Sequence, residues 1–257
     1  MAEAPCREMD NDFDPIADVY EELVAWAPCG NWVRDLARRL HRHGLRRGDL
    51  VLDAACGTGL STFPWAERGY RVLGVDRSEP MLALARAKLA GRDLPIRFER
   101  SDLLQLDLPD RCNLPGTFDL AVCMHSGLDY ILDLERLARA FRCLRSTLRP
   151  GGLLAFDKCL DEPGFYREPY SSTRRISGGQ AVFHYSWDSA RKLFIQRCSV
   201  ERNGPGGGPR RTEFTHYMLA VELGRLIRMV EEAGFELLEA PTQFSMIDPG
   251  MGIFRAV

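Results

Sequence analysis

The sequence predicts an α/β protein with a seven-stranded, mostly parallel sheet and helices on both faces, and three observations support this prediction. From Leu50 to about Cys159, short β-rich runs alternate with helical stretches, an order that builds parallel strands joined by crossover helices. Between about Leu160 and Leu219 the pattern changes to alternation of apolar and polar residues, which indicates an antiparallel β insertion after the fifth strand. Two helices are expected before the first strand, where they form a helical lid.

The expected elements follow in order along the chain. The seven strands are predicted at residues 51–55, 71–76, 96–102, 118–124, 153–159, 235–240 and 252–257. The clearest helix begins near Leu134, has apolar residues at i, i+3, i+4 and i+7, and is expected to close at Pro150-Gly151-Gly152. The lid helices are expected at 15–27 and 31–43, the inserted strands at 174–177, 181–188, 192–204 and 212–219, and a last helix at 221–233.

These elements suggest four parts of the chain. We expect an N-terminal helical lid at 1–43, a cofactor-binding core at 44–159, the β insertion on the substrate side at 160–219, and a C-terminal completion of the core at 220–257.

Composition excludes several classes of protein. The 257 residues include 34 Lys and Arg and 36 Asp and Glu, which gives a net charge of −2. The protein therefore lacks the excess of basic residues that is typical of a nucleic-acid binder. No run of about 18 apolar residues and no signal peptide occurs, so a cytoplasmic protein without a membrane or nucleic-acid partner is expected. The cysteines form no CxxC pair and the histidines no ligand cluster, so no metal site is expected.

A glycine-rich turn between the first strand and the next helix indicates a nucleoside site. Gly57 and Gly59 allow a ligand to approach the backbone, and Asp76 ends the second strand about 20 residues on, where a carboxylate accepts from both ribose hydroxyls. Thr62 stands where a dinucleotide site has its third glycine, and Asp53 precedes the turn. An anion beside the turn repels pyrophosphate, so the ligand is expected to be positively charged. Asp53 and the missing third glycine therefore oppose the alternative of an NAD-dependent oxidoreductase.

These residues resemble the class I S-adenosylmethionine-dependent methyltransferases, which have a Rossmann-like sheet. DAACGTG at 53–59 is similar to their first motif, and LRPGG at 148–152 to the turn before their fifth strand. The resemblance implies S-adenosylmethionine as cofactor, with Asp76 on the ribose, Asp102 and Leu103 on the adenine, and the backbone of 123–125 at the methionine end. It implies the following cofactor-binding residues: Tyr20, Trp32, Asp53, Ala55, Gly57, Gly59, Asp76, Met81, Asp102, Leu103 and Met124.

A narrower resemblance is to small-molecule methyltransferases that carry a β insertion after the fifth strand, such as macrolide aminosugar N-methyltransferases, glycine N-methyltransferase and YqeM-like proteins. Their lids carry two aromatic residues, matched here by Tyr20 and Trp32, which implies contacts to the methionine end of the cofactor. The resemblance implies a small-molecule acceptor, such as a natural-product intermediate, methylated on nitrogen or oxygen rather than carbon, and it leaves homo-oligomerisation open. A cofactor-binding protein that transfers no methyl group, or a cyclase on the same fold, remains an alternative.

Three residues are candidate bases for methyl transfer. His125 and Tyr130 follow the fourth strand, at the sheet edge where ligands bind. His216 lies in an inserted strand with Glu213, and alternation places these two side chains on opposite faces unless a bulge intervenes. The sequence leaves open which of the three acts as a base.

Overall fold

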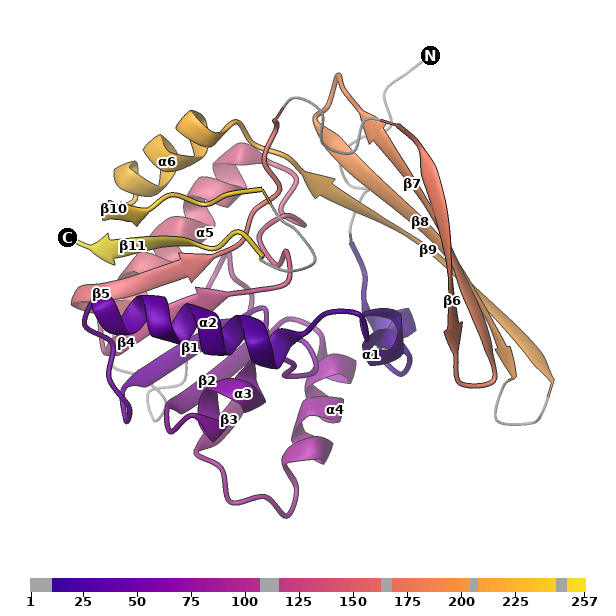
Figure 1. Cartoon of the computed structure of the whole chain (residues 1–257), viewed down its shortest axis with the longest axis horizontal. Coiled ribbons are helices and arrows are strands. Elements are labelled where there is room, and N and C mark those ends of the chain that lie inside the picture. Colours follow the sequence, from indigo (N-terminus) through magenta and orange to yellow (C-terminus); the bar gives the residue numbers. More distant parts are fainter. Residues whose placement is uncertain (1–10, 107–115, 163–167, 204–207, 244–248) are drawn as a thin grey trace.

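The computed structural model describes residues 11–106, 116–162, 168–203, 208–243 and 249–257. Its larger sheet comprises β1 (Leu50–Ala54), β2 (Arg71–Asp76), β3 (Ile96–Arg100), β4 (Phe118–Cys123), β5 (Leu148–Phe156), β10 (Phe235–Glu239) and β11 (Gly252–Ala256). The strand order is β10-β11-β5-β4-β1-β2-β3 (Figure 1). In this sheet as described, β11 runs antiparallel to both of its neighbours, β10 and β5, and the other strand pairs are parallel. The predicted seven-stranded, mostly parallel sheet is therefore confirmed.

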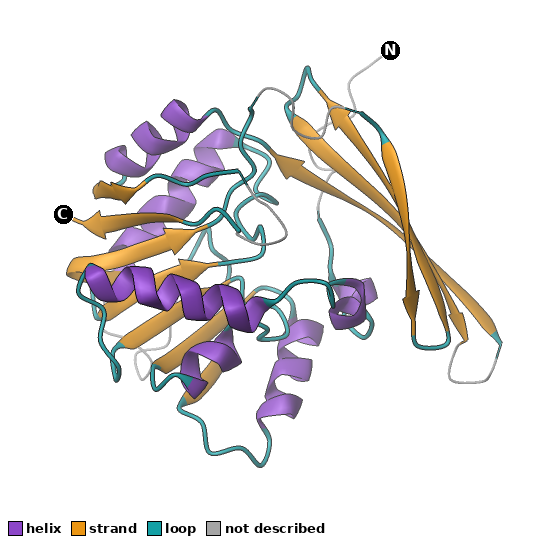
Figure 2. Cartoon of the chain, viewed as in Figure 1, coloured by secondary structure: helices purple, strands orange, loops and turns teal. Residues whose placement is uncertain are grey.

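Helices cover both faces of this sheet (Figure 2). Buried side chains of α2 (Cys29–Arg42), α3 (Thr62–Glu67) and α4 (Glu79–Leu89) form one apolar cluster with the sheet. Those of α5 (Leu134–Thr147) and α6 (Leu223–Glu232) form a second cluster on the opposite face. Two apolar layers therefore hold the strands, and the carboxyl ends of the parallel strands share one edge. No helix in the described part of the chain is both long and apolar enough to span a bilayer.

The helix expected to run to Pro150-Gly151-Gly152 ends earlier. Asp133 caps α5 by accepting from the N–H of Arg136 at 2.8 Å, and the helix stops at Thr147. Residues 148–152 belong to β5, so the predicted turn before this strand is wrong. The pairing register shifts instead, with Phe118 opposite Leu148 and Leu120 opposite Leu153. The proline and two glycines are thus accommodated as an irregularity inside the strand.

The insertion forms a separate antiparallel sheet. Its strands are β6 (Tyr170–Ile176), β7 (Gly179–Asp188), β8 (Leu193–Asn203) and β9 (Pro209–Leu219), in that spatial order. Phe183, Tyr185 and Cys198 are buried on the face that packs on the N-terminal segment. Pairing of β8 with β9 continues in register past Glu213 and His216, so no bulge brings these two side chains to one face.

The N-terminal segment lies between the core and the smaller sheet (Figure 1). The single helix expected at 15–27 is wrong: the chain makes a 3-10 turn at Asp14–Ile16 and a one-turn helix, α1 (Tyr20–Leu23). Ile16, Val19 and Leu23 recur at helical spacing, but they are buried against the inserted sheet. Packing across this interface, rather than a continuous helix, buries the apolar residues. The second expected helix, at 31–43, corresponds to α2.

Candidate active site

A cavity of about 510 Å³ lies at the carboxyl ends of the parallel strands, where ligands bind in open α/β sheets. Its volume falls within the roughly 300–1,000 Å³ typical of small-molecule sites. The turn after β1, the end of β2, the segment after β3 and the loop after β4 line it, and residues 11–14 together with Tyr20 cover it. Four strand ends and the N-terminal segment therefore meet around one space.

The glycine-rich turn presents backbone to this cavity. Ala55 and Gly57 both line the cavity and have positive φ angles, of 57° and 54°. A Cβ at Gly57 would meet no atom within 4 Å, so the backbone is open to a ligand there. Gly59 has a different role and does not line the cavity: a Cβ would come within 3.0 Å of Phe63, so this glycine allows close packing.

Asp76 lies beside the turn at the end of β2 and lines the cavity. Its Oδ2 accepts from the N–H of Gly57 at 2.8 Å, and its Oδ1 accepts from the N–H of Ser78 at 2.9 Å. Burial raises the pKa of this carboxyl, while the two N–H donors act in the opposite direction. Each carboxylate oxygen has two lone pairs, so both oxygens keep an acceptor site for the hydroxyls of a ribose.

Further predicted cofactor residues line the next part of the cavity. Met81 and Met124 contribute apolar surface, and Asp102 and Leu103 follow β3. Asp102 is exposed, and its Oδ1 accepts from the N–H of Leu104 at 2.8 Å. This local turn holds the carboxylate at the rim of the cavity.

Besides Gly59, two predicted cofactor residues do not line the cavity. Asp53 is buried beneath the turn, where its Oδ2 accepts from the hydroxyls of Ser61 at 2.8 Å and Thr62 at 2.6 Å. Burial raises the pKa of Asp53 to about 6, against the opposing effect of these bonds. Trp32 is 3% exposed, and its ring lies 5.0 Å from that of His125. Asp53 therefore fixes the start of α3, and Trp32 supports a residue that lines the cavity.

His125 follows β4 in a strained turn. It and Ser126 both have φ angles of 62°, a region that residues other than glycine seldom adopt. The imidazole lines the cavity, and its Nε2 lies 2.8 Å from Sγ of Cys29 at the start of α2. Burial lowers the pKa of His125 to about 4, so its ring is neutral at pH 7.

Tyr130 and His216 lie close together, but only Tyr130 lines the cavity. Their ring centres are 5.6 Å apart, and the ring of Phe13 contacts both, at 4.9 Å from Tyr130 and 4.1 Å from His216. His216 is 3% exposed, its Nε2 lies 3.3 Å from the carbonyl oxygen of Asp12, and burial lowers its pKa to about 4.

Burial also raises the pKa of Tyr130 well above its usual value. Glu213 is on the opposite face, where it pairs with Arg211.

Comparison with known proteins agrees with this geometry. Residues 51–152 match the methyltransferase domain family. The putative methyltransferase GWCH70_2453 of Geobacillus sp. (strain WCH70) is 26% identical over 239 residues, which cover 91% of this chain and 92% of that protein. Residues 51–152 are therefore a methyltransferase domain, and the chain is a methyltransferase.

Two further comparisons support this assignment of the methyltransferase. The putative methyltransferase YqeM of Bacillus subtilis (strain 168) is 33% identical over 145 residues, which span 56% of this chain and 54% of that protein. CalS10 of Micromonospora echinaspora, an amino pentose methyltransferase solved with S-adenosylmethionine bound, is 20% identical. Its TM-score is 0.75 over 93% of this chain and 97% of CalS10, a similarity of fold. The expected Rossmann-like fold and the methyltransferase domain are thereby confirmed.

The cavity of the methyltransferase fits S-adenosylmethionine. The open backbone at Gly57 leaves space for a ligand, and Asp76 has acceptor sites for a ribose diol. We expect Asp76 to hold the ribose and Asp102 the adenine amino group, as the resemblance implies. When bound, S-adenosylmethionine supplies an electrophilic methyl group on a sulfonium.

Several residues that build the site of the methyltransferase carry no recognisable sequence signal. Asn11, Asp12, Phe13 and Asp14 line the cavity, and Cys29 contacts His125. The first four belong to an irregular segment and a 3-10 turn, so no periodic pattern marks them. Cys29 and His125 are 96 positions apart, and neither belongs to a motif that predicts their contact.

Proposed function

We propose that this methyltransferase methylates an amine nitrogen of a small molecule. The protonation behaviour of the candidate bases supports nitrogen over oxygen. The pKa of His125 and that of His216 are both about 4, which makes them weak bases, and the raised pKa of Tyr130 keeps its hydroxyl protonated. A hydroxyl acceptor requires a base to remove its proton, and efficient general bases have a pKa near the working pH. A neutral amine already presents a lone pair.

The side chains around the cavity also suit an amine. The carboxylates of Asp12 and Asp14 line it together with the rings of Phe13, Tyr20 and Tyr130. The ring of Phe13 is perpendicular, within about 12°, to both tyrosine rings, at centroid distances of 6.0 Å from Tyr20 and 4.9 Å from Tyr130. Carboxylates and aromatic faces both attract a cationic amine. We therefore place the acceptor in the cavity beneath the N-terminal segment, beside Phe13 and Tyr130.

In this proposal the chain's own residues bind and orient the acceptor, and they exclude water from the cavity. Methyl transfer is an in-line displacement, so the acceptor nitrogen must lie about 3 Å from the methyl carbon. The N-terminal segment covers the cavity, and Phe13 fixes the ring of Tyr130 on the acceptor side. Asp12 and Asp14 would attract the protonated amine before it releases its proton to solvent. The name of CalS10, an amino pentose methyltransferase, is consistent with a natural-product amine as acceptor.

A matched acceptor screen tests this function. Purified protein is incubated with labelled S-adenosylmethionine and three amines: glycine, an amino pentose and a short peptide with a free N-terminus. For the sugar, the control is the same pentose with a hydroxyl in place of the amine. We expect methylation of an amine and none of the matched alcohol, with a rate that rises with pH through the acceptor's own pKa.

Variants of the candidate bases complete the test. With an amine acceptor, His125→Ala and His216→Ala should leave the pH at which the rate rises unchanged, because neither ring removes the proton. Methylation of the alcohol, together with a ~100- to 10,000-fold loss in one of these variants, would instead show oxygen transfer with general-base catalysis.

A further inference from the structure

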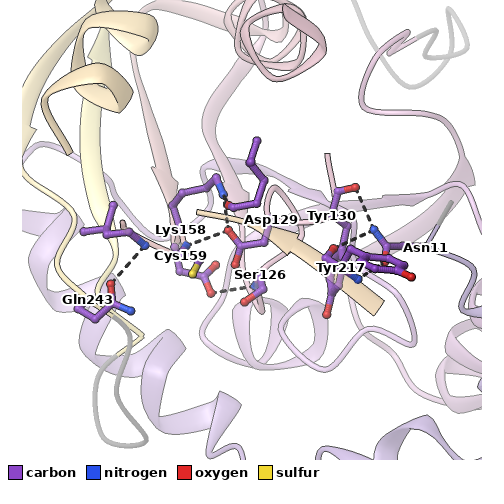
Figure 3. Close-up of polar contacts among 11 residues, drawn as sticks. Asn11, Ser126, Asp129, Tyr130, Lys158, Cys159, Tyr217 and Gln243 are labelled. Carbon is purple, nitrogen blue, oxygen red and sulfur yellow. Dashed lines mark hydrogen bonds and ion pairs between the residues drawn. The ribbon is translucent and has the colours of Figure 1, made fainter. Parts of the chain in front are cut away.

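A wholly buried lysine lies just beyond the end of β5, and it does not line the cavity. The side chain of Lys158 is 0% exposed, and its Nζ donates to Oδ1 of Asp129 at 2.7 Å. Nζ also donates to the carbonyl oxygen of Leu219, and the same Asp129 oxygen accepts from the N–H of Cys159 at 2.9 Å (Figure 3). We refer to Lys158, Asp129 and Leu219 as the buried node.

The buried node joins three segments that are far apart in the sequence. Lys158 follows β5, Asp129 belongs to the loop between β4 and α5, and Leu219 is the last residue of β9 in the inserted sheet. The backbone N–H of Leu219 also donates directly to the carbonyl oxygen of Asp129 at 2.8 Å. The loop and the inserted sheet are therefore bonded to each other, and the lysine ties both to the core.

The loop held by this node carries residues that line the cavity. Tyr130 directly follows Asp129, and its carbonyl oxygen accepts from Nδ2 of Asn11 at 3.2 Å. Asn11 also donates to the carbonyl oxygen of Tyr217 at 3.0 Å and accepts from the N–H of Tyr217 at 2.7 Å (Figure 3). A displacement of Asp129 would thus move Tyr130, the start of the N-terminal segment and the end of β9 together.

Stability alone does not explain a buried ion pair. Withdrawing two charges from water costs several kcal/mol per ion, and apolar residues of similar volume often stabilise a fold equally well or better. The hydrogen bonds of an ion pair are directional, so the pair can fix the relative positions of three segments more closely than apolar packing does. The geometry of the node therefore favours a positioning role.

We propose that Lys158 and Asp129 are positioning residues for methyl transfer: their buried ion pair fixes the Tyr130 loop, which lines the cavity, against the inserted sheet. They act through Tyr130 and Asn11, and neither contacts the space in which the cofactor and acceptor bind. The inference requires methyl transfer, but it does not depend on whether the acceptor atom is nitrogen.

The test uses a double variant that removes the charges without leaving one of them unpaired. Lys158→Met preserves the length of the side chain, and Asp129→Asn keeps an oxygen for the N–H of Cys159. The control is Lys192→Met, which removes the ion pair between the half-exposed Lys192 and Asp161, 3.0 Å long, next to the inserted sheet. Each protein is examined by thermal unfolding, S-adenosylhomocysteine calorimetry and hydrogen exchange of residues 124–133 and 209–219.

We expect the double variant to unfold cooperatively and to bind S-adenosylhomocysteine as tightly as the wild type. Hydrogen exchange should accelerate in the two named segments and not in the β1 to β3 region. With the amine that the wild type methylates fastest in the screen, kcat should fall ~10- to 100-fold, the scale of a misplaced reacting group. Lys192→Met should change none of these quantities.

A folded double variant with unchanged exchange in both segments would overturn the proposal, and so would an unchanged kcat. The exchange measurement needs no acceptor, so it decides the question even if every amine in the panel fails. Failure of the panel would count against the proposed function and not against the role of the node.

Discussion

Sγ of Cys29 lies 2.8 Å from Nε2 of His125, so the first residue of α2 is in hydrogen-bond contact with the loop after β4. Burial raises the pKa of Cys29 to about 11, so the thiol keeps its proton at pH 7. That proton has two acceptors within reach, the carbonyl oxygen of Ala27 at 3.4 Å and the nearer imidazole nitrogen. Donation to Nε2 places the ring proton of His125 on Nδ1.

This contact predicts the tautomer of His125. We expect nitrogen NMR of labelled protein at pH 7 to show a proton on Nδ1 and an unprotonated Nε2. Cys29→Ala should change the tautomer populations of His125 and leave those of His184, on the inserted sheet, unaltered. A wild-type ring with its proton on Nε2 would mean that the sulfur accepts instead.

Asp76 is expected to dominate binding of the ribose. Asp76→Ala should weaken S-adenosylhomocysteine binding by ~1.5–3 kcal/mol, the scale of hydrogen bonds to a charged group. Calorimetry measures this change, with Asp35→Ala on the exposed side of α2 as the control. We expect no binding of NAD to either variant or to the wild type; tight NAD binding would contradict the assignment of the site.

Two buried histidines predict a loss of stability in acid. The pKa of His125 and that of His216 fall from 6.5 to about 4, mainly through burial, which disfavours the charged ring. Between pH 6.5 and 4 the unfolded chain binds protons that the folded chain does not, so stability falls as pH falls through this window. His216→Phe should reduce this loss by on the order of 2 kcal/mol. Denaturant unfolding at pH 7, 5.5 and 4.5 measures the effect, and an equal pH dependence in wild type and variant would refute it.

The N-terminal segment is expected to close over the bound cofactor. Arg174 of β6 donates to the carbonyl oxygen of Leu23, and its guanidinium lies 5.6 Å from the ring of Trp26 and 4.6 Å from that of Phe183. We expect S-adenosylhomocysteine to slow proteolysis within residues 10–43, and Arg174→Ala to accelerate it. Arg175→Ala, on the exposed face of the same strand, is the control. Equal cleavage with and without ligand would count against closure.

The fold was predicted from local sequence patterns, and most of these patterns identified the correct strand or helix. Parallel strands buried on both faces are short and apolar, and amphipathic helices between them show a regular period, so the seven strands and α5 were recognisable. The lid helix at 15–27 failed because Ile16, Val19 and Leu23 have helical spacing, while their burial depends on a sheet that begins about 150 residues later. A short-range pattern cannot report such a partner.

The sequence by itself identified the strand-end lining of the cavity, since Gly57, Asp76 and Asp102 belong to one contiguous unit of strands and turns. The tertiary structure alone decided which distant segments hold that lining in place. Cys29 meets His125, and Lys158 meets Asp129 and Leu219, across separations of 96, 29 and 61 positions. Such contacts form only when helices, loop and inserted sheet pack together, because nothing in the local spacing of these residues specifies a neighbour so far along the chain.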